Sequence, residues 1–158
     1  MRAVIQRVEK AAVLVDGEIV GACEKGFLIL LGIGKQDTEK TAMLLADKIA
    51  KLRVFSDEEG KMNRSITECG YSVLLVSQFT LYADTSHGNR PSFFDSAPPQ
   101  LAEPLYQLLG RLLQEKGIAL EWGRFGADMT IEASLQGPVT IFLDTDTMQK
   151  KPKAALIP

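Results

Sequence analysis

Residues 73–84 read VLLVSQFTLYAD, and the interpretation of the whole chain starts from this stretch. Its first four residues are all apolar, which is typical of a strand that is covered on both faces. Ser77, Gln78 and Thr80 then place three hydrogen-bonding side chains where a core strand would carry aliphatic ones. Because buried polar groups need partners, a strand that ends in this way predicts a binding site.

The sequence on either side of this stretch predicts further strands. Asp16-Gly17 is the two-residue signal for a type I′ hairpin. Alternating or continuous apolar runs predict strands at 2–8, 12–15, 18–20, 27–31, 119–123, 127–135 and 139–143. The pair Gly137-Pro138 is expected to interrupt the last two of these strands.

Two helices are also expected. Asp37 or Thr38 caps the first, and its inner face is Ala42, Leu45, Ile49 and Leu52. The second begins at Pro98-Pro99 and ends near Gly117, and its apolar stripe is Leu101, Leu105, Leu108, Leu109 and Leu112. Since these helices do not alternate with the strands, the pattern predicts an α+β fold with a mostly antiparallel, barrel-like sheet.

Length and composition narrow the class of protein. A chain of 158 residues suits one domain, here residues 1–147, followed by a loosely ordered extension at 148–158. No apolar run is long enough to span a membrane, and the start of the chain is not typical of a signal peptide, so we expect a cytoplasmic protein. The net charge of −2 argues against a broad nucleic-acid surface but leaves room for a local contact.

The usual catalytic side chains are scarce. Ser77 and Thr80 are candidate nucleophiles, but the only histidine, His87, lies in a loop of turn-forming residues, next to Gly88. A solvated loop histidine is a simpler interpretation than a Ser-His-Asp triad with Asp84 or Asp95. Cys23 and Cys69 do not have the spacing of a metal site, so no metal or cofactor is expected. An enzyme built from this chain would rely on hydroxyl groups, backbone N–H groups and its substrate.

Two further features leave alternatives open. Gly137-Pro138 is either a trans proline at a strand end or a cis bond in a local distortion. Arg90, within the segment GNRPSF at 88–93, is either a surface arginine or a ligand for a phosphate or carboxylate group.

Taken together, SQFTL at 77–81, NRPSF at 89–93 and GPVT at 137–140 resemble the D-aminoacyl-tRNA deacylase family. IQRV at 5–8, LLG at 30–32, SDEEGKMN at 56–63 and GRFGADM at 123–129 fit the same order and spacing. The resemblance covers residues 1 to about 145. It implies the family's β-rich dimeric fold and hydrolysis of the ester between a D-amino acid and the terminal adenosine of tRNA.

The resemblance also implies roles for individual residues. Ser77, Gln78, Phe79 and Thr80 match the catalytic strand end, where backbone groups and a ribose 2′-hydroxyl assist water and no side chain attacks. Gly137 and Pro138 match a Gly-cisPro pair that enters the partner subunit's pocket and rejects L-amino acids, while glycine on a mischarged tRNA is accepted. Arg7 matches a residue that holds this pair, and Met129 belongs to the substrate-binding set. Candidate tRNA contacts are Lys61, Arg64 and Arg90.

The chain departs from the family where Leu135-Gln136 replaces the common Asn-Asp before the Gly-Pro pair. The departure bears on strict D-selectivity.

The alternative outside the enzymes is a non-catalytic dimeric module that binds nucleotides or RNA. A related deacylase that clears L-alanine from the wrong tRNA is disfavoured by the motif at 77–80.

Overall fold

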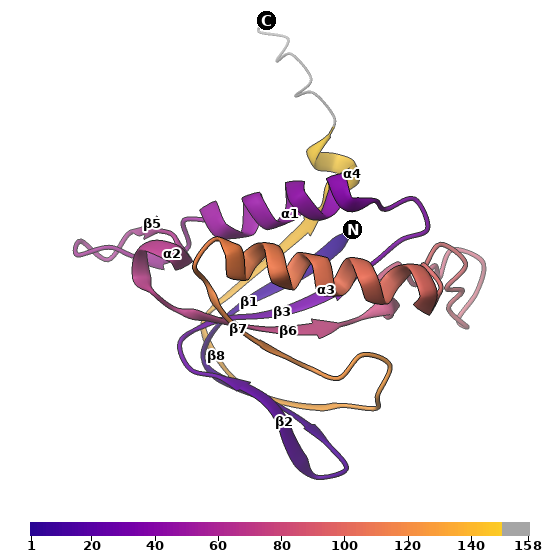
Figure 1. Ribbon diagram of the computed structural model, residues 1–158, viewed down its shortest axis with the longest axis horizontal. Coiled ribbons are helices and arrows are strands. Elements are labelled where there is room, and N and C mark those ends of the chain that lie inside the picture. The colour runs from indigo at the N-terminus through magenta and orange to yellow at the C-terminus, as the bar shows by residue number, and fades with distance from the viewer. Residues whose placement is uncertain (150–158) are drawn as a thin grey trace, which may run out of the picture.

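The computed structural model of the protein describes residues 1–149. In chain order the elements are β1 (Arg2–Val15), β2 (Glu18–Cys23), β3 (Gly26–Gly32), α1 (Glu39–Lys51), β4 (Phe55–Ser56), β5 (Met62–Arg64), α2 (Ile66–Cys69), β6 (Ser72–Ser77), the 3-10 helix η1 (Phe79–Tyr82), α3 (Pro99–Glu115), β7 (Ala119–Trp122), β8 (Thr130–Asp144) and α4 (Thr145–Met148). Helices α1 and α3 pack side by side across one face of the main sheet, and the β1–β2 hairpin projects from the other side (Figure 1).

The main sheet has the order β2-β1-β3-β6-β7, with β8 paired to the free side of β1. Strand β1 pairs antiparallel with β2, β3 and β8, whereas β3, β6 and β7 run parallel to one another. The small β4–β5 hairpin is antiparallel. The α+β class with a mostly antiparallel, curved sheet is therefore confirmed, and α1 and α3 lie in the connections between its parallel strands.

Strand β3 and residues 73–76 of β6 are apolar because both faces of these central strands are covered. Phe27, Ile29 and Leu75 face the large cluster beneath the helices. Leu28 and Leu74 alternate with them and belong to a second cluster on the opposite face. The covered strand predicted at 73–76 is thus confirmed.

Local sequence signals explain where the hairpin and the helices begin and end. Asp16 and Gly17 both have positive φ, 50° and 78°, as a type I′ turn requires. Thr38, not Asp37, is the N-cap of α1, and its N–H donates to the Thr41 hydroxyl at 2.8 Å. Helix α3 starts at Pro99, and Gly117, at φ 84°, follows its C-cap.

Several expected boundaries were wrong. The strands expected at 2–8 and 12–15 are one strand, β1, and those at 127–135 and 139–143 are one strand, β8. Strand β8 runs through Gly137-Pro138 because the β1–β8 register shifts there, so the proline replaces no ladder donor. The expected extension at 148–158 lies outside the described residues from residue 150 onward, while Met148 closes α4.

The buried stripe of α3 also differs from the predicted one. Leu105 and Leu109 are buried as expected, whereas Leu101, Leu108 and Leu112 are only partly buried. Ala102, Tyr106 and Leu113 complete the buried face. Over residues 1–149, no helix has the length and apolar character needed to cross a membrane.

Candidate active site

A cavity of about 620 Å³ opens where β3 and β6 end. Ser77 pairs with Leu31 in the parallel register, and the N–H of Gln78 donates to the Leu31 carbonyl at 2.8 Å, so both strands end at the same edge. The start of α3 and the segment between β7 and β8 close the other sides. The cavity is lined by Leu31, Ile33, Val76, Ser77, Gln78, Phe79, Phe93, Ser96, Ala97, Pro99, Ala102, Phe125, Gly126, Ala127, Asp128, Met129 and Ile131.

The predicted strand end turns into η1 beside this cavity. Gln78 is its N-cap, with φ −144° and ψ 79°, and its side-chain amide donates to the Thr80 hydroxyl. Ser77, Gln78 and Phe79 line the cavity, whereas Thr80 stands in the next position, outside the lining. Three of the four residues predicted at the strand end therefore share one cavity wall.

Backbone donors remain available at this turn. The N–H groups of Leu81 and Ala83 donate to the carbonyls of Gln78 and Thr80, at 3.3 and 3.0 Å. Those of Phe79 and Thr80 find no acceptor within residues 1–149, as expected for the first turn of a helix. Two unpaired N–H groups beside a cavity are suited to binding a carbonyl oxygen or an oxyanion.

Within residues 1–149, Asp128 is the one carboxylate among the cavity-lining residues, and no hydrogen bond joins it to the hydroxyl of Ser77 or of Thr80. His87 lies in the exposed loop between η1 and α3 and does not line the cavity. Asp84 is held locally, because hydrogen bonds from the side chain and the N–H of Ser86 keep the pKa of its carboxyl below the ordinary value. Among residues 1–149, no group of three or more His, Cys, Asp or Glu side chains is arranged to hold a metal ion.

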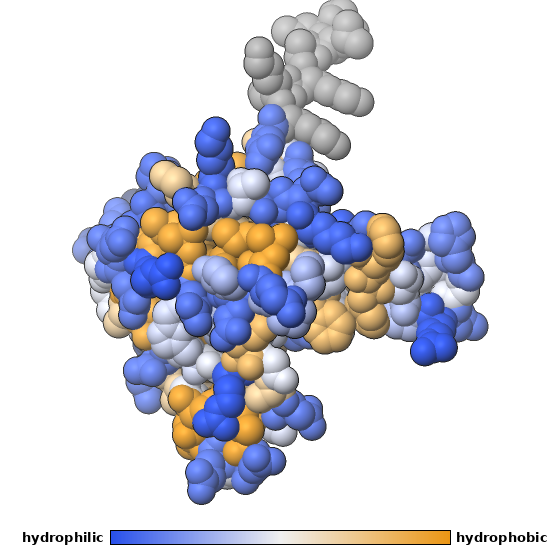
Figure 2. Space-filling view, turned by 45° about the vertical axis from the view of Figure 1, so that its right-hand side comes forward, coloured by the Kyte–Doolittle hydropathy of each residue, from blue (hydrophilic) through white to orange (hydrophobic). Residues whose placement is uncertain are grey.

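Aromatic side chains form much of the cavity wall. Phe79 and Phe93 meet edge to face with ring centroids 5.0 Å apart, and Phe79 remains 57% exposed. Phe125 packs against Tyr106, whose hydroxyl donates to the Leu75 carbonyl of β6 at 2.8 Å. In Figure 2 the loop that projects on the right, between η1 and α3, carries apolar surface at its base among hydrophilic side chains.

Met129 lines the cavity, as its place in the predicted substrate-binding set requires. Its sulfur lies 3.1 Å from the position that a Cβ atom on Gly123 would take, so Gly123 leaves room for it. Phe125 and the segment 126–128 were not singled out from the sequence as site residues. They belong to the run GRFGADM at 123–129, which resembles a motif of the deacylase family, but the resemblance implied a role only for Met129.

Gly137 and Pro138 lie elsewhere. The peptide bond between them is cis, and Gly137 has φ 116°. Arg7 Nη2 is 3.1 Å from the position of a Cβ on residue 137, and Nη1 of the same side chain donates to the Val54 carbonyl at 2.6 Å. Arg7 pairs with Phe27 of β3, which is four residues, or about 13 Å at the rise of a strand, from Leu31 of the cavity wall. Neither Gly137 nor Pro138 lines the cavity of its own chain.

The candidate tRNA contacts do not form one patch. Lys61 and Arg64 belong to the β4–β5 hairpin at one end of the molecule, and Arg90 lies in the exposed loop at the other (Figure 1). Lys61 pairs with Glu59 at 3.0 Å, and Arg64 donates to the Glu68 carbonyl at 3.2 Å.

Comparison with known proteins assigns this architecture to a family. A family model described as D-Tyr-tRNA(Tyr) deacylase matches residues 4–144. A D-aminoacyl-tRNA deacylase of Roseiflexus castenholzii is 56% identical over 145 residues, covering 92% of each chain. One from Thermus aquaticus is 53% identical, covering 92% of this chain and 95% of its own.

Two solved structures share the fold. The c-Myc DNA unwinding element binding protein superposes with a TM-score of 0.85 at 40% identity, over 91% of this chain and 98% of its own. A probable eukaryotic D-amino acid tRNA deacylase superposes with a TM-score of 0.78 over 90% and 97%. At 15% identity, the second likeness bears on the fold alone.

Proposed function

Since this chain belongs to the D-Tyr-tRNA(Tyr) deacylase family, we propose that it hydrolyses the ester between a D-amino acid and the terminal adenosine of tRNA. The observation that carries this proposal is the cavity at the ends of β3 and β6, whose wall contains Ser77, Gln78 and Phe79 of the family motif. An aromatic-lined space with a few polar groups at one edge suits an aminoacyl-adenosine terminus. Release of tRNA in translation is consistent with a cytoplasmic protein.

In the proposed mechanism, backbone groups of the turn bind the ester carbonyl. Water adds to the carbonyl carbon, the N–H groups of Phe79 and Thr80 stabilise the oxyanion, and the bond to the ribose 3′-oxygen then breaks. The 3′-oxygen takes up a proton and leaves as a hydroxyl, while the neighbouring 2′-hydroxyl of the substrate assists the water. Thr80 does not attack, because no base within residues 1–149 stands beside its hydroxyl, which accepts from Gln78.

Selection of the D-amino acid is proposed to come from a second subunit. Gly137 and Pro138 lie too far along β1 to reach the cavity of their own chain, so in a homodimer they would serve the partner's cavity. There their carbonyls would crowd an L side chain and tolerate glycine or a D side chain. This arrangement would also permit removal of glycine from mischarged tRNA. Arg7 would support the pair from the side, since its Nη2 lies 3.1 Å from the position that a Cβ on Gly137 would take.

The tRNA body requires only local contacts, in keeping with the net charge of −2. Arg90 and Lys61 are exposed, and Arg64 lies on the same hairpin as Lys61. The hairpin with Lys61 and Arg64 and the loop with Arg90 lie at opposite ends of one chain. They would therefore contact different parts of one acceptor stem, or two tRNA molecules bound at the two cavities of the dimer.

A non-catalytic nucleic-acid-binding module is the second candidate, and one observation favours it. The c-Myc DNA unwinding element binding protein, 40% identical to this chain, bears a name that describes DNA binding. An apolar cavity next to unpaired backbone donors is more typical of an enzyme site than of a duplex-binding surface, which would carry clustered positive charge.

The test is deacylation of matched D-Tyr-tRNA and L-Tyr-tRNA by the purified protein in the presence of EDTA. Loss of the D-ester alone is the expected result. Loss of neither ester would leave the binding module as the better account. Loss of both would retain the hydrolase and contradict the chiral filter; the double variant Leu135→Asn/Gln136→Asp, which restores the commoner residues, is the matched control for that outcome.

A further inference from the structure

The turn η1 is too short to hold its own shape. It spans four residues, and none of them is buried. A 3-10 helix of this length has few internal hydrogen bonds, and their geometry is poorer than in an α-helix. At its two ends, the N–H groups of Leu81 and Ala83 donate to the carbonyls of Gln78 and Thr80, at 3.3 and 3.0 Å. An element this short depends on outside contacts to fix the backbone from Gln78 to Thr80.

Arg2, the second residue of β1, makes the most direct contact with the turn. Its Nη1 donates to the Leu81 carbonyl at 2.9 Å, and its guanidinium carbon lies 4.5 Å from the centroid of the Tyr82 ring. Nε of the same group faces Asp144 Oδ2 at 3.3 Å, which keeps the planar fork aligned. One side chain thus contacts two successive residues of η1 while it is anchored on β8.

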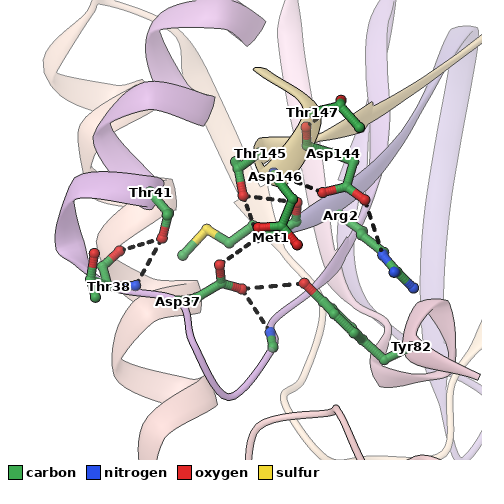
Figure 3. Close-up of polar contacts among 11 residues, drawn as sticks. Met1, Arg2, Asp37, Thr38, Thr41, Tyr82, Asp144, Thr145, Asp146 and Thr147 are labelled. Carbon is green, nitrogen blue, oxygen red and sulfur yellow. Dashed lines mark hydrogen bonds and ion pairs between the residues drawn. The ribbon is translucent and has the colours of Figure 1, made fainter. Parts of the chain in front are cut away.

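A buried carboxylate supports the other edge of the Tyr82 ring. Asp37 accepts from the α-ammonium group of Met1 at 2.5 Å, from the N–H of Gly34 at 2.7 Å and from the Tyr82 hydroxyl at 3.4 Å. Figure 3 shows Met1, just before β1, and Tyr82 of η1 converging on Asp37, which lies in the segment before α1. Burial and the Asp37 charge both raise the pKa of Tyr82, so its hydroxyl stays protonated and remains a donor.

Two glycines allow the turn to approach β3. A Cβ atom on Gly32 would lie 3.0 Å from the Gln78 carbonyl oxygen and from the Leu81 Cβ. A Cβ on Gly34 would lie 2.8 Å from three atoms of the Tyr82 ring. Gly32 and Gly34 therefore allow close packing against η1.

From these contacts we propose that Arg2 is a positioning residue of the deacylase, which acts through Leu81 and Tyr82 on the backbone of Gln78, Phe79 and Thr80. The inference rests on the proposed chemistry at this strand end. Arg2 does not line the cavity, so its effect is transmitted by the turn. Because a displacement of about 1 Å at a reacting centre can cost on the order of 100-fold in rate, loss of the anchor affects turnover more than substrate binding.

The test compares Arg2→Met and Arg2→Lys with a control, Lys116→Met. Lys116 is a suitable match, since it is 33% exposed against 34% for Arg2, and it also pairs with an aspartate, Asp47. Lys116 is the C-cap at the far end of α3, about 21–26 Å at the rise of a helix from Pro99 and Ala102, which line the cavity. Each protein is assayed for kcat and KM on D-Tyr-tRNA and for hydrogen exchange at the amides of Leu81 and Ala83.

We expect Arg2→Met to lower kcat at least tenfold, leave KM within about twofold and speed exchange at both amides at least tenfold. Arg2→Lys should recover part of both losses, because an ammonium group still donates to the Leu81 carbonyl. Unchanged kcat in Arg2→Met, or an equal loss in Lys116→Met, would overturn the proposal.

Exchange separates this inference from the proposed function. Unchanged exchange at Leu81 and Ala83 would overturn the hold of Arg2 on the turn, whatever the activity. If the wild type does not deacylate D-Tyr-tRNA but Arg2→Met still speeds exchange, the contact of Arg2 with the turn is supported. Its link to deacylation is then overturned, because the proposed function itself is wrong.

Discussion

Replacing Gly34 with alanine tests how tightly η1 is packed. The added methyl group would stand 2.8 Å from Cε1, Cζ and Oη of Tyr82, against about 3.5–4.0 Å for a relaxed contact, so the ring must retreat by roughly 1 Å. Tyr82 is not free to retreat, because Arg2 lies over its face and Asp37 accepts from its hydroxyl.

The expected cost follows from two opposing terms. Overpacking costs about 1–3 kcal/mol, while the alanine stiffens the unfolded chain and returns about 0.4–1 kcal/mol. The net loss in free energy of unfolding is thus about 0–2.6 kcal/mol, and the middle of that range, about 1.3 kcal/mol, corresponds to roughly 3–5 °C in Tm for a domain of this size. Since the retreating ring belongs to η1, kcat on D-Tyr-tRNA should fall as well.

The assay is urea unfolding of four proteins: wild type, Gly34→Ala, Tyr82→Ala and the double variant. With the ring removed, the methyl group meets open space, and Gly34→Ala should be neutral or stabilising. The coupling free energy between the two positions should then reach about 1–3 kcal/mol. An equal cost of Gly34→Ala in both backgrounds would refute the reasoning and assign the strain to the backbone of residue 34.

Three other predictions concern the site and its support. Thr80→Ala should keep deacylation within about tenfold of wild type, whereas loss of a true nucleophile costs on the order of 10⁶ in kcat; a fall of that size in a folded protein would restore a nucleophilic threonine. Gly110→Ala should lower the free energy of unfolding by about 1–3 kcal/mol in thermal or urea denaturation, because its Cβ would lie 2.0 Å from the Trp122 ring. Burial raises the pKa of the Cys23 thiol from 9.0 to about 11. Iodoacetamide at pH 8 should therefore modify Cys23 about 100-fold more slowly in the native than in the urea-unfolded protein, and the stability due to the neutral thiol should be complete below pH 9 and lost as the pH rises through 11.

Residues whose structure depends on near neighbours in sequence were predictable. The hairpin at Asp16-Gly17 and the start of α3 at Pro99 follow from backbone preferences of one or two residues. The doubly covered strand β6 follows from its four apolar residues. The parallel pairing of β3 with β6 was not predicted, because it depends on where α1 packs, and no local pattern records that.

The continuity of β8 through Pro138 was missed for a related reason. Proline is disfavoured within a strand because it cannot donate to a ladder. Here the β1–β8 pairing skips from Thr140 to Leu135, and the strand has β1 as its ladder partner within residues 1–149, so no donor is required at that point. This follows only from the register in which β8 pairs with β1, and that register cannot be predicted from the sequence of β8 alone.

The site divides in the same way. Ser77, Gln78 and Phe79 were predictable, because polar residues at the end of an apolar strand need hydrogen-bond partners and therefore indicate a binding site. Arg2 was not, since 79 positions separate it from the Leu81 carbonyl that it binds, and an arginine near a chain start has no local signature of such a contact. The same holds for Phe125, which reaches the cavity from the segment after β7.

This division follows from the kind of chemistry that the site is proposed to perform. When side chains do the catalysis, reactive residue types identify the site directly in the sequence. When backbone N–H groups and a substrate hydroxyl do it, every residue type except proline has the necessary group, and the specific requirement falls on the residues that fix the backbone. In this chain those features are the glycines that admit the turn, the buried carboxylate of Asp37 and the guanidinium of Arg2. Substitutions there should impair turnover as severely as changes in the cavity wall, although none of these residues touches the ester.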